Sequence, residues 1–219
     1  MEVKNHKKIT GGVYLVIDPA MNRAVLLSKL ASALQGKLEA VQLWNNWTPG
    51  DDKLQCIEAV GQLCRQHNVP LLIDNDWELL LQSPYLDGIH FDAIPADYAL
   101  IKQKIDKLFI AGITCQGNLD VVRWADENLL DYVSFCAMFP SPSAGSCDIV
   151  MPATVRQAKS MTGLPLFVSG GITPANMTML RQQTPFDGVA VISGIMSADD
   201  PLSKVKLYHN ALTENISKS

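Results

Sequence analysis

Residues 166–194 have the sequence LFVSGGITPANMTMLRQQTPFDGVAVISG, and the pattern of this segment recurs along the whole chain. A short apolar run ends at Ser169 and is followed by Gly170 and Gly171. After a longer segment, a second apolar run at 188–192 leads into Ser193 and Gly194. Short β-branched runs that alternate with longer segments of helical period indicate strands alternating with helices. The alternation predicts a parallel sheet that is covered by helices.

Eight such runs occur, and we expect strands at 13–18, 40–44, 70–74, 88–91, 108–114, 132–136, 166–169 and 188–192. A strand-helix unit of about 25 residues repeated eight times favours a (β/α)8 TIM barrel. A doubly wound sheet is the alternative, but its dinucleotide-binding form needs a GxGxxG turn after the first strand, where this chain has Pro19-Ala20-Met21. We predict a single domain over residues 1–219, with residues 1–10 as a short polar N-terminal extension.

Composition and charge narrow the class of partner. The chain is 47% hydrophobic and its formal net charge is −4, and no basic run is longer than Lys7-Lys8, which disfavours nucleic acid and anionic membranes as partners. No apolar stretch approaches the roughly 20 residues of a membrane span, and the N-terminus lacks the apolar core of a signal peptide. The five cysteines form no CxxC pair. We expect a cytoplasmic protein with small-molecule ligands, and the sequence leaves open whether it forms a homo-oligomer.

The loops after the seventh and eighth predicted strands carry the strongest local signal. Barrels of this type place their chemistry at the carboxyl ends of the strands and often bind a phosphate between these two loops. Paired glycines let backbone N–H groups approach a ligand, and a helix that begins at Ser193 would direct its N-terminus to the same place. We therefore predict a phosphate site between the loops at 169–174 and 191–194; two ordinary tight turns are the alternative.

Taken together, the segments along the chain resemble the thiamine-phosphate synthase superfamily, which includes the related thiazole tautomerases. The order and spacing of the segments, rather than any single one, carry the resemblance. They are YLVID at 14–18, VQL at 41–43, LIDND at 72–76, DGIH at 87–90, DYV at 131–133, FPSPS at 139–143, GGITP at 170–174 and DGVAVIS at 187–193.

The resemblance implies a reaction and a site. A synthase couples hydroxymethylpyrimidine pyrophosphate with a thiazole phosphate: pyrophosphate leaves first, and the thiazole nitrogen then attacks the pyrimidine-methyl cation. The resemblance implies Thr114 and Asn75 as catalytic residues, and Mg²⁺ held by Asp76 and Asp92. The second metal ligand, counted without gaps, falls on Pro95, and Asp92 is the nearby carboxylate. The implied substrate-binding residues are Gln42, Asn46, Asn75, Ser141, Ser143, Gly171, Ile192 and Ser193.

The chain departs from the family pattern where pyrophosphate would bind. The family's Gln-Leu-Arg-x-Lys is QLWNN here, so Trp44 and Asn46 replace Arg and Lys, and Ala144 replaces the Lys of Thr-x-Thr-Lys. A hydrogen bond to a charged group contributes about 1.5–3 kcal/mol, so the loss of three cations predicts a degraded pyrophosphate half. The nearest basic residues in sequence, Lys37 and Lys53, do not lie at predicted strand ends.

Two alternatives to the synthase remain open from the sequence. One is a thiazole tautomerase-like isomerase, although the acid/base His of those relatives is Gln116 here; His90, in the neighbouring loop, is a candidate in its place. The other is a non-catalytic protein that binds thiazole phosphate. The sequence also leaves open whether Trp44 stacks on a pyrimidine or fills the vacated pocket.

Overall fold

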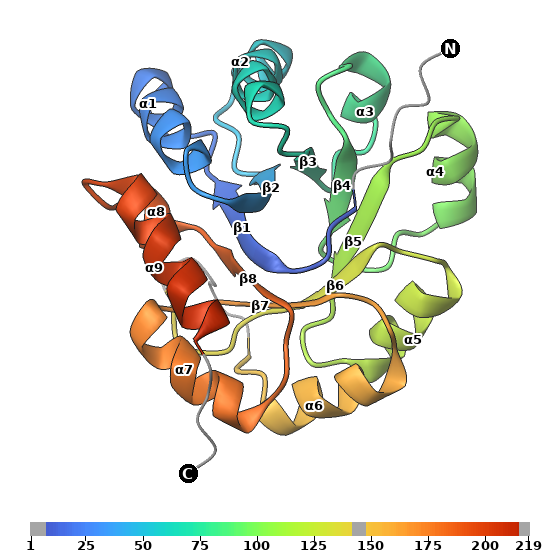
Figure 1. The fold of residues 1–219 in the computed structure, drawn as a ribbon. Helices are drawn as coiled ribbons and strands as arrows, with labels where there is room; N and C mark the ends of the chain where they lie inside the picture. Colours follow the sequence, from blue (N-terminus) through green and yellow to red (C-terminus); the bar gives the residue numbers. More distant parts are fainter. Residues whose placement is uncertain (1–7, 142–147, 215–219) are drawn as a thin grey trace.

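The computed structural model describes residues 8–141 and 148–214, and these form a closed barrel of parallel strands in the order β1 to β8 (Figure 1). The (β/α)8 prediction is confirmed, and each predicted strand overlaps an observed one. The strands are β1 (Gly12–Ile17), β2 (Leu38–Leu43), β3 (Leu71–Asp74), β4 (Gly88–Phe91), β5 (Ile110–Thr114), β6 (Tyr132–Phe135), β7 (Leu166–Ser169) and β8 (Gly188–Val191).

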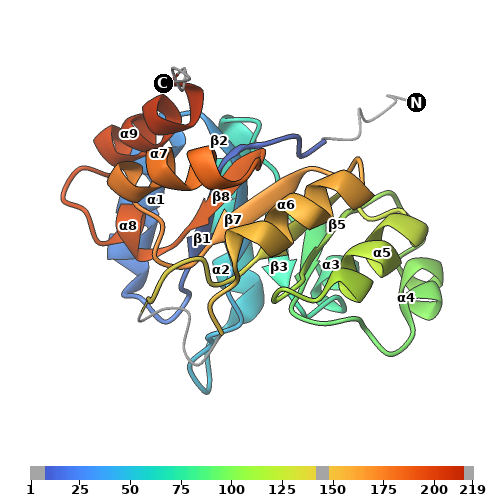
Figure 2. The ribbon, with the colours of Figure 1, turned by 90° about the horizontal axis from the view of Figure 1, so that it is seen from below.

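The helices form a ring around the barrel, as Figures 1 and 2 show. They are α1 (Arg23–Leu34), α2 (Lys53–Gln66), α3 (Leu79–Gln82), α4 (Tyr98–Ile105), α5 (Leu119–Glu127), α6 (Pro152–Met161), α7 (Pro174–Gln183), α8 (Ser193–Met196) and α9 (Pro201–Thr213). Polar side chains set where several of them begin. Asp52 accepts the N–H of Gln55, and Thr173 and Asn176 form a capping box at the start of α7, whose first residue is Pro174.

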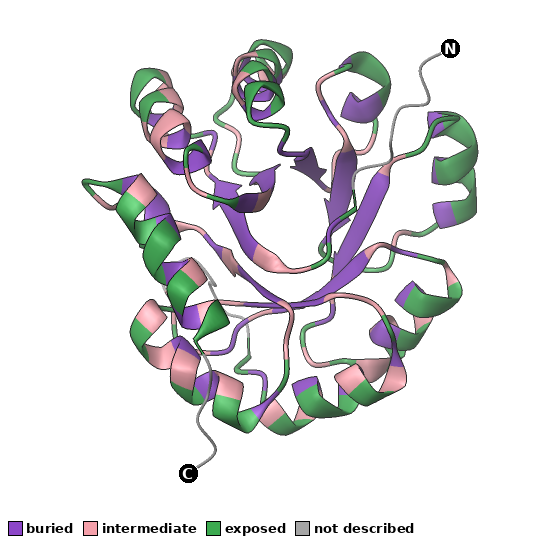
Figure 3. Cartoon of the chain, in the orientation of Figure 1, coloured by how far each residue is buried: buried purple, intermediate pink, exposed green. Residues whose placement is uncertain are grey.

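Most of the core lies between the strands and the helices, where the purple, buried faces of the elements meet in Figure 3. A second, smaller core fills the inside of the barrel. There the rings of Tyr14, Tyr132 and Phe167 pack edge to face, with centroids 5.5 to 5.7 Å apart. Gly112 leaves space for one of these rings, because a Cβ on it would lie 2.0 Å from the Tyr132 ring. These rings close the barrel interior beneath its carboxyl end.

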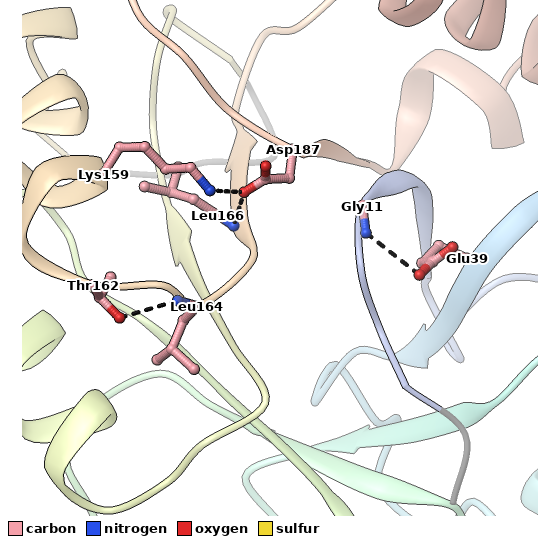
Figure 4. Close-up of polar contacts among 7 residues, drawn as sticks. All are labelled: Gly11, Glu39, Lys159, Thr162, Leu164, Leu166 and Asp187. Atoms are coloured by element: carbon pink, nitrogen blue, oxygen red, sulfur yellow. Dashed lines mark hydrogen bonds and ion pairs between the residues drawn. The ribbon is translucent and has the colours of Figure 1, made fainter.

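The expected extension at residues 1–10 lies mostly outside the described residues. Within the described part, Ile9 is only 2% exposed and packs with the aromatic rings inside the barrel. The Glu39 carboxylate accepts hydrogen bonds from the backbone N–H groups of Thr10 and Gly11, and the second of these is drawn in Figure 4. Ile9 is therefore packed inside the barrel, whereas Thr10 is exposed, and the extension at residues 1–10 stays a prediction.

Three aspartates that helped to carry the family resemblance bond the amino ends of neighbouring strands. Each precedes an even-numbered strand, and its Oδ2 accepts the N–H near the start of the strand before it. Asp87 accepts a hydrogen bond from the Leu71 N–H at 3.0 Å. Asp131 accepts one from the Ala111 N–H at 2.8 Å. Asp187 bonds Leu166 at 2.7 Å and also pairs with Lys159, as Figure 4 shows. These residues stabilise the barrel at the end opposite the predicted site.

Candidate active site

The carboxyl end of the barrel has a floor of polar side chains, one from each of six neighbouring strands. Four of them are almost fully buried: Gln42 at 5% exposed, Asp74 at 1%, His90 at 6% and Ser134 at 4%. Because side chains alternate along a strand, Asp74 shares the inward face with Leu72, which belongs to the core inside the barrel. Buried polar side chains are uncommon, and groups of them occur often at functional sites, so this floor is the candidate site. The six residues are Gln42, Asp74, His90, Thr114, Ser134 and Ser169.

A chain of hydrogen bonds crosses the floor and joins five strands. The Tyr14 hydroxyl donates to Gln42 Oε1 at 2.7 Å and lies 2.8 Å from the Tyr132 hydroxyl. The Tyr132 hydroxyl lies 2.8 Å from His90 Nδ1, and His90 Nε2 lies 2.8 Å from Thr114 Oγ1. Thr114 is half-buried at the mouth, so this chain links the predicted catalytic threonine to the barrel interior. Sequence reasoning missed Tyr14 and Tyr132, because their contacts depend on strands far apart in sequence.

Burial changes the protonation of the floor. It lowers the pKa of the His90 imidazole to about 4, against the opposing effect of the Asp92 carboxylate. Burial and the charge of Asp92 together raise the pKa of Asp74 to about 7, against the lowering effect of the hydrogen bond from the Asn45 backbone N–H. His90 is therefore neutral at pH 7, with one donor and one acceptor nitrogen, and Asp74 is close to half ionised.

Asn75, a predicted catalytic and substrate-binding residue, joins the loops that follow β3 and β4. Its Nδ2 donates to Asp92 Oδ2 at 2.7 Å, and its Oδ1 accepts the backbone N–H of Asp92 at 2.9 Å. Its backbone is left-handed, with φ of 57°, a conformation that asparagine tolerates better than most residues. Asn75 thus positions Asp92 through both ends of its amide.

The predicted metal ligand Asp76 is paired with Lys53. The Lys53 ammonium lies 2.8 Å from Asp76 Oδ2, and it comes from the first turn of α2 rather than from a strand end. Asp74 differs, since its Oδ1 is buried and has no hydrogen-bond partner among the residues that the structure describes. Within residues 8–141 and 148–214, no group of three or more His, Cys, Asp or Glu side chains is arranged to hold a metal. The assignment of Asp76 and Asp92 stays a prediction.

The residues that replace the family's Arg and Lys make other contacts in this protein. The Asn46 side chain donates to both carboxylate oxygens of Asp18, at 3.1 and 3.0 Å. Trp44 is partly buried and packs against the core inside the barrel together with Ile192. Ala144 lies outside the described residues, as does the predicted Ser143. This side of the mouth therefore carries a carboxylate and an indole where the family pattern has two positive charges.

The loops after β6, β7 and β8 lie against one another. Gly170 and Gly171 have φ of 81° and 64°, and a Cβ on Gly171 would lie 2.7 Å from the Phe139 Cβ. The Tyr208 hydroxyl of α9 donates to the Ile172 carbonyl at 2.8 Å, and a Cβ on Gly194 would lie 2.3 Å from this hydroxyl. Tyr208 therefore holds the two predicted phosphate loops together. Because α8 is only four residues long, it can offer individual N–H groups rather than a strong helix dipole.

A cavity of about 380 Å³ opens beside Asn75 and Asp92, between the mouth and α4. Its lining is largely apolar and excludes the floor residues, so we do not assign it to a substrate. The remaining lining residues are Trp77, Phe91, Ala93, Pro95, Ala96, Asp97, Leu100 and Ile101.

The fold and the site define a (β/α)8 barrel of the enzyme type, with buried polar groups and glycine-rich loops together at the carboxyl end of the strands. Residues 13–195 match the family model described as thiamine monophosphate synthase. The chain belongs to this family, and its relatives place it among the transferases of thiamine biosynthesis.

Individual relatives agree with this assignment. The chain is 29% identical over 203 residues to a thiamine-phosphate synthase of Xanthomonas campestris pv. campestris, an alignment that covers 93% of this chain and 96% of the relative. It is 30% identical over 201 residues to one of Methylobacillus flagellatus, covering 90% and 93%. The thiamine phosphate pyrophosphorylase structure from Pyrococcus furiosus has a TM-score of 0.78 at 20% identity, covering 94% and 96%, and supports the fold. Among the described residues, no helix has the length and apolarity to span a membrane.

Proposed function

We propose that this protein couples hydroxymethylpyrimidine pyrophosphate with a thiazole phosphate, releasing pyrophosphate and forming thiamine phosphate. The observation that carries the proposal is that a polar floor and two glycine-rich loops lie at the same end of the barrel. A two-substrate reaction needs one subsite for each partner within reach of the other. Family membership supplies the chemistry for which these subsites would be used.

The thiazole half of this proposed site would use the loops that follow β6, β7 and β8. Gly171, Ile192 and Ser193 would hold the phosphate through backbone N–H groups, with Ser141 and Ser143 on the neighbouring loop. The left-handed φ of Gly171, and its close approach to the loop after β6, explain why a larger residue would displace this loop. The phosphate then fixes the thiazole ring over the floor, where its nitrogen would meet the pyrimidine carbon.

The pyrimidine half would use the floor itself. Gln42 and Thr114 present polar groups at the mouth, and Asn75 keeps Asp92 in place beside them. The departing pyrophosphate needs positive charge near it, since charge develops on it as the bond breaks. Lys53 lies at this mouth, but its charge is shared with Asp76, and Asn46 is held by Asp18. We therefore expect slow departure of pyrophosphate and a low turnover number.

Magnesium remains part of the proposal because the family resemblance implies it. Carboxylate oxygens, which Mg²⁺ prefers as ligands, are present at the mouth. When bound, Mg²⁺ would neutralise charge on the pyrophosphate oxygens. Asp92 and the unpartnered oxygen of Asp74 are carboxylate donors beside the mouth. Asp76 would have to exchange its contact with Lys53 for the metal. The carboxylates thus fit a weakly held ion.

The experiment that tests this function is a calorimetric titration of the protein with each substrate. We expect thiazole phosphate to bind without metal and pyrimidine pyrophosphate to bind only with Mg²⁺. Binding of thiazole phosphate alone, at all Mg²⁺ concentrations, would contradict the synthase and leave the isomerase or the non-catalytic binder. For the isomerase, the Thr114–His90 contact supplies a base that Gln116 cannot.

A further inference from the structure

The proposed reaction does not use the cavity of about 380 Å³ beside Asn75 and Asp92. This cavity lies between the loop that follows β3, the loop that follows β4 and the first turn of α4. Small-molecule sites in proteins have volumes from about 300 Å³ upward. The cavity is therefore large enough for a small ligand of its own.

Two aromatic side chains line the cavity, and other contacts hold each of them in place. Phe91 is buried, and its ring packs edge to face on Tyr98 with centroids 5.9 Å apart. The Lys104 ammonium lies 5.4 Å from the centroid of the Trp77 ring. This indole therefore already attracts a positive charge, as the electron-rich face of an aromatic ring does. Rings that are held in this way form a site before any ligand binds.

The charged side chains that line the cavity are acidic. They are Asp92 and Asp97, and no lysine, arginine or histidine is among the described lining residues. Asp97 Oδ1 accepts the N–H of Leu100 at 2.9 Å, and Asp92 Oδ2 accepts the Asn75 amide at 2.7 Å. Within the described part of the chain, the other oxygen of each carboxylate accepts no hydrogen bond. The cavity therefore favours a positively charged ligand and disfavours a phosphorylated one.

We propose that this cavity is a second binding site, and that its ligand is a heteroaromatic cation without a phosphate group. Aromatic faces attract organic cations, and carboxylates beside them add to this attraction. The choice of a heteroaromatic ring rests on the proposed function. Attack by the thiazole nitrogen leaves this nitrogen with a permanent positive charge, which neither substrate ring carries. The site would thus recognise the type of ring that the reaction produces.

A ligand in the cavity would act on the mouth through Asn75 and Asp92. Both residues line the cavity, and the Asn75 amide holds Asp92 through two hydrogen bonds. A cation in contact with Asp92 competes with the Asn75 amide for this carboxylate, and Asn75 is a predicted substrate-binding residue. The ligand and pyrimidine pyrophosphate should therefore weaken each other's binding, by the same factor in both directions.

Binding to the cavity can be tested without any substrate. The probes are 3-benzylthiazolium, which carries the positive charge, and neutral 5-benzylthiazole, which has the same rings. The protein has four tryptophans, and NMR of ¹⁵N-labelled protein in EDTA observes their indole N–H groups. The signal missing from Trp77→Phe is that of Trp77. We expect the cation to shift this signal and to bind about fivefold or more tightly than the neutral probe.

Variants of two lining residues locate the site, with affinities measured by calorimetry. Asp97→Asn removes a charge but keeps a side chain that caps helices, and should weaken binding of the cation about threefold or more. Asp200→Asn is the matched control, because Asp200 caps α9 in the same way and does not line the cavity. Its affinity should equal that of the wild type. Trp77→Leu should lose more affinity than Trp77→Phe, since phenylalanine keeps an aromatic face.

Three results would overturn the second site. They are equal binding of the two probes, an equal loss in Asp97→Asn and Asp200→Asn, and shifts that spare the Trp77 signal.

The coupling to the mouth has its own test, a calorimetric titration with pyrimidine pyrophosphate and Mg²⁺. Saturating 3-benzylthiazolium should weaken this binding about threefold or more, and Asp97→Asn should reduce the effect. An effect of equal size in Asp97→Asn would place the probe in the mouth, and unchanged affinity in the wild type would overturn the coupling. Protein that binds the cation but not pyrimidine pyrophosphate contradicts the proposed function and the coupling that rests on it, and leaves the second site standing.

Discussion

The ammonium of Lys53 lies 2.8 Å from the carboxylate of Asp76, although 23 residues separate the two in sequence. This ion pair brings a positive charge to a mouth from which the family's Arg and Lys are missing. If Lys53 assists the departing pyrophosphate, Lys53→Gln should weaken binding of pyrimidine pyrophosphate about tenfold or more, since a charged hydrogen bond contributes about 1.5–3 kcal/mol. Binding constants measured by calorimetry in the presence of Mg²⁺ check this.

Lys37→Gln is the control for Lys53→Gln, because Lys37 lies at the amino end of β2 and lines a different pocket. An equal loss in the two variants would mean that only the net charge of the protein matters, and would contradict a specific role for Lys53.

Restoring a cation should improve the reaction. Asn46→Lys replaces the amide that Asp18 holds with the residue type of the family pattern, and we expect pyrophosphate release to rise severalfold. The readout is the steady-state rate with both substrates. Gln62→Lys adds the same charge on the exposed surface of α2 and should leave the rate unchanged. No gain in Asn46→Lys would show that this side of the mouth does not contact pyrophosphate.

A substitution at Gly171 tests whether the loops after β7 and β8 bind the thiazole phosphate. Gly171→Ala places a side chain at φ of 64° and within 3 Å of the loop after β6. We expect thiazole phosphate to bind at least tenfold more weakly. Gly163→Ala is the matched control, since a Cβ on Gly163 meets no atom within 4 Å and the residue has no positive φ. Unchanged affinity in Gly171→Ala would place the phosphate elsewhere.

The raised pKa of Asp74 predicts how the free energy of unfolding depends on pH. Its pKa is raised to about 7 in the folded protein, from 3.8, so the folded state favours the protonated form. The stability associated with this proton is fully present below pH 4 and is lost as pH rises through 7. The difference corresponds to roughly 4 kcal/mol at most.

Denaturant unfolding between pH 5 and 8, with EDTA present, measures this effect. Asp74→Asn mimics the protonated form and should lose less stability than the wild type over that range. The titratable groups that act on Asp74 are Asp92, Tyr14 and Tyr132, and neither tyrosine ionises in this range because burial raises the pKa of both. A wild type and variant with parallel pH profiles would contradict the raised pKa.

The barrel was predictable from sequence because each strand is a compact apolar run. Two predicted strands, 88–91 and 166–169, have the observed bounds, and the others differ by a few residues at their ends. The alternation of side chains along the third strand also indicates which carboxylate faces the inside of the barrel. Leu72 and Asp74 share the inward face, and Asp74 is the last residue of the strand, so Asp74 is the carboxylate that the strand directs inward, whereas Asp76 lies in the loop beyond it.

What could not be predicted are contacts between residues distant in sequence. Tyr14 and Tyr132 are separated by 118 residues, and Asn46 and Asp18 by 28, and no local pattern specifies either pair. Lys53 does not lie at a predicted strand end, yet its long side chain reaches the mouth of the barrel. The cytoplasmic location, the absence of nucleic-acid and membrane partners, and the oligomeric state stay predictions.

The most direct test of the synthase assignment is a coupling assay with purified protein, both substrates and Mg²⁺, in which thiamine phosphate and pyrophosphate are quantified together. We expect slow formation of the two products in equal amounts, dependent on both substrates and faster in Asn46→Lys. Binding of both substrates with no product in either protein, after many hours at high enzyme concentration, would contradict it.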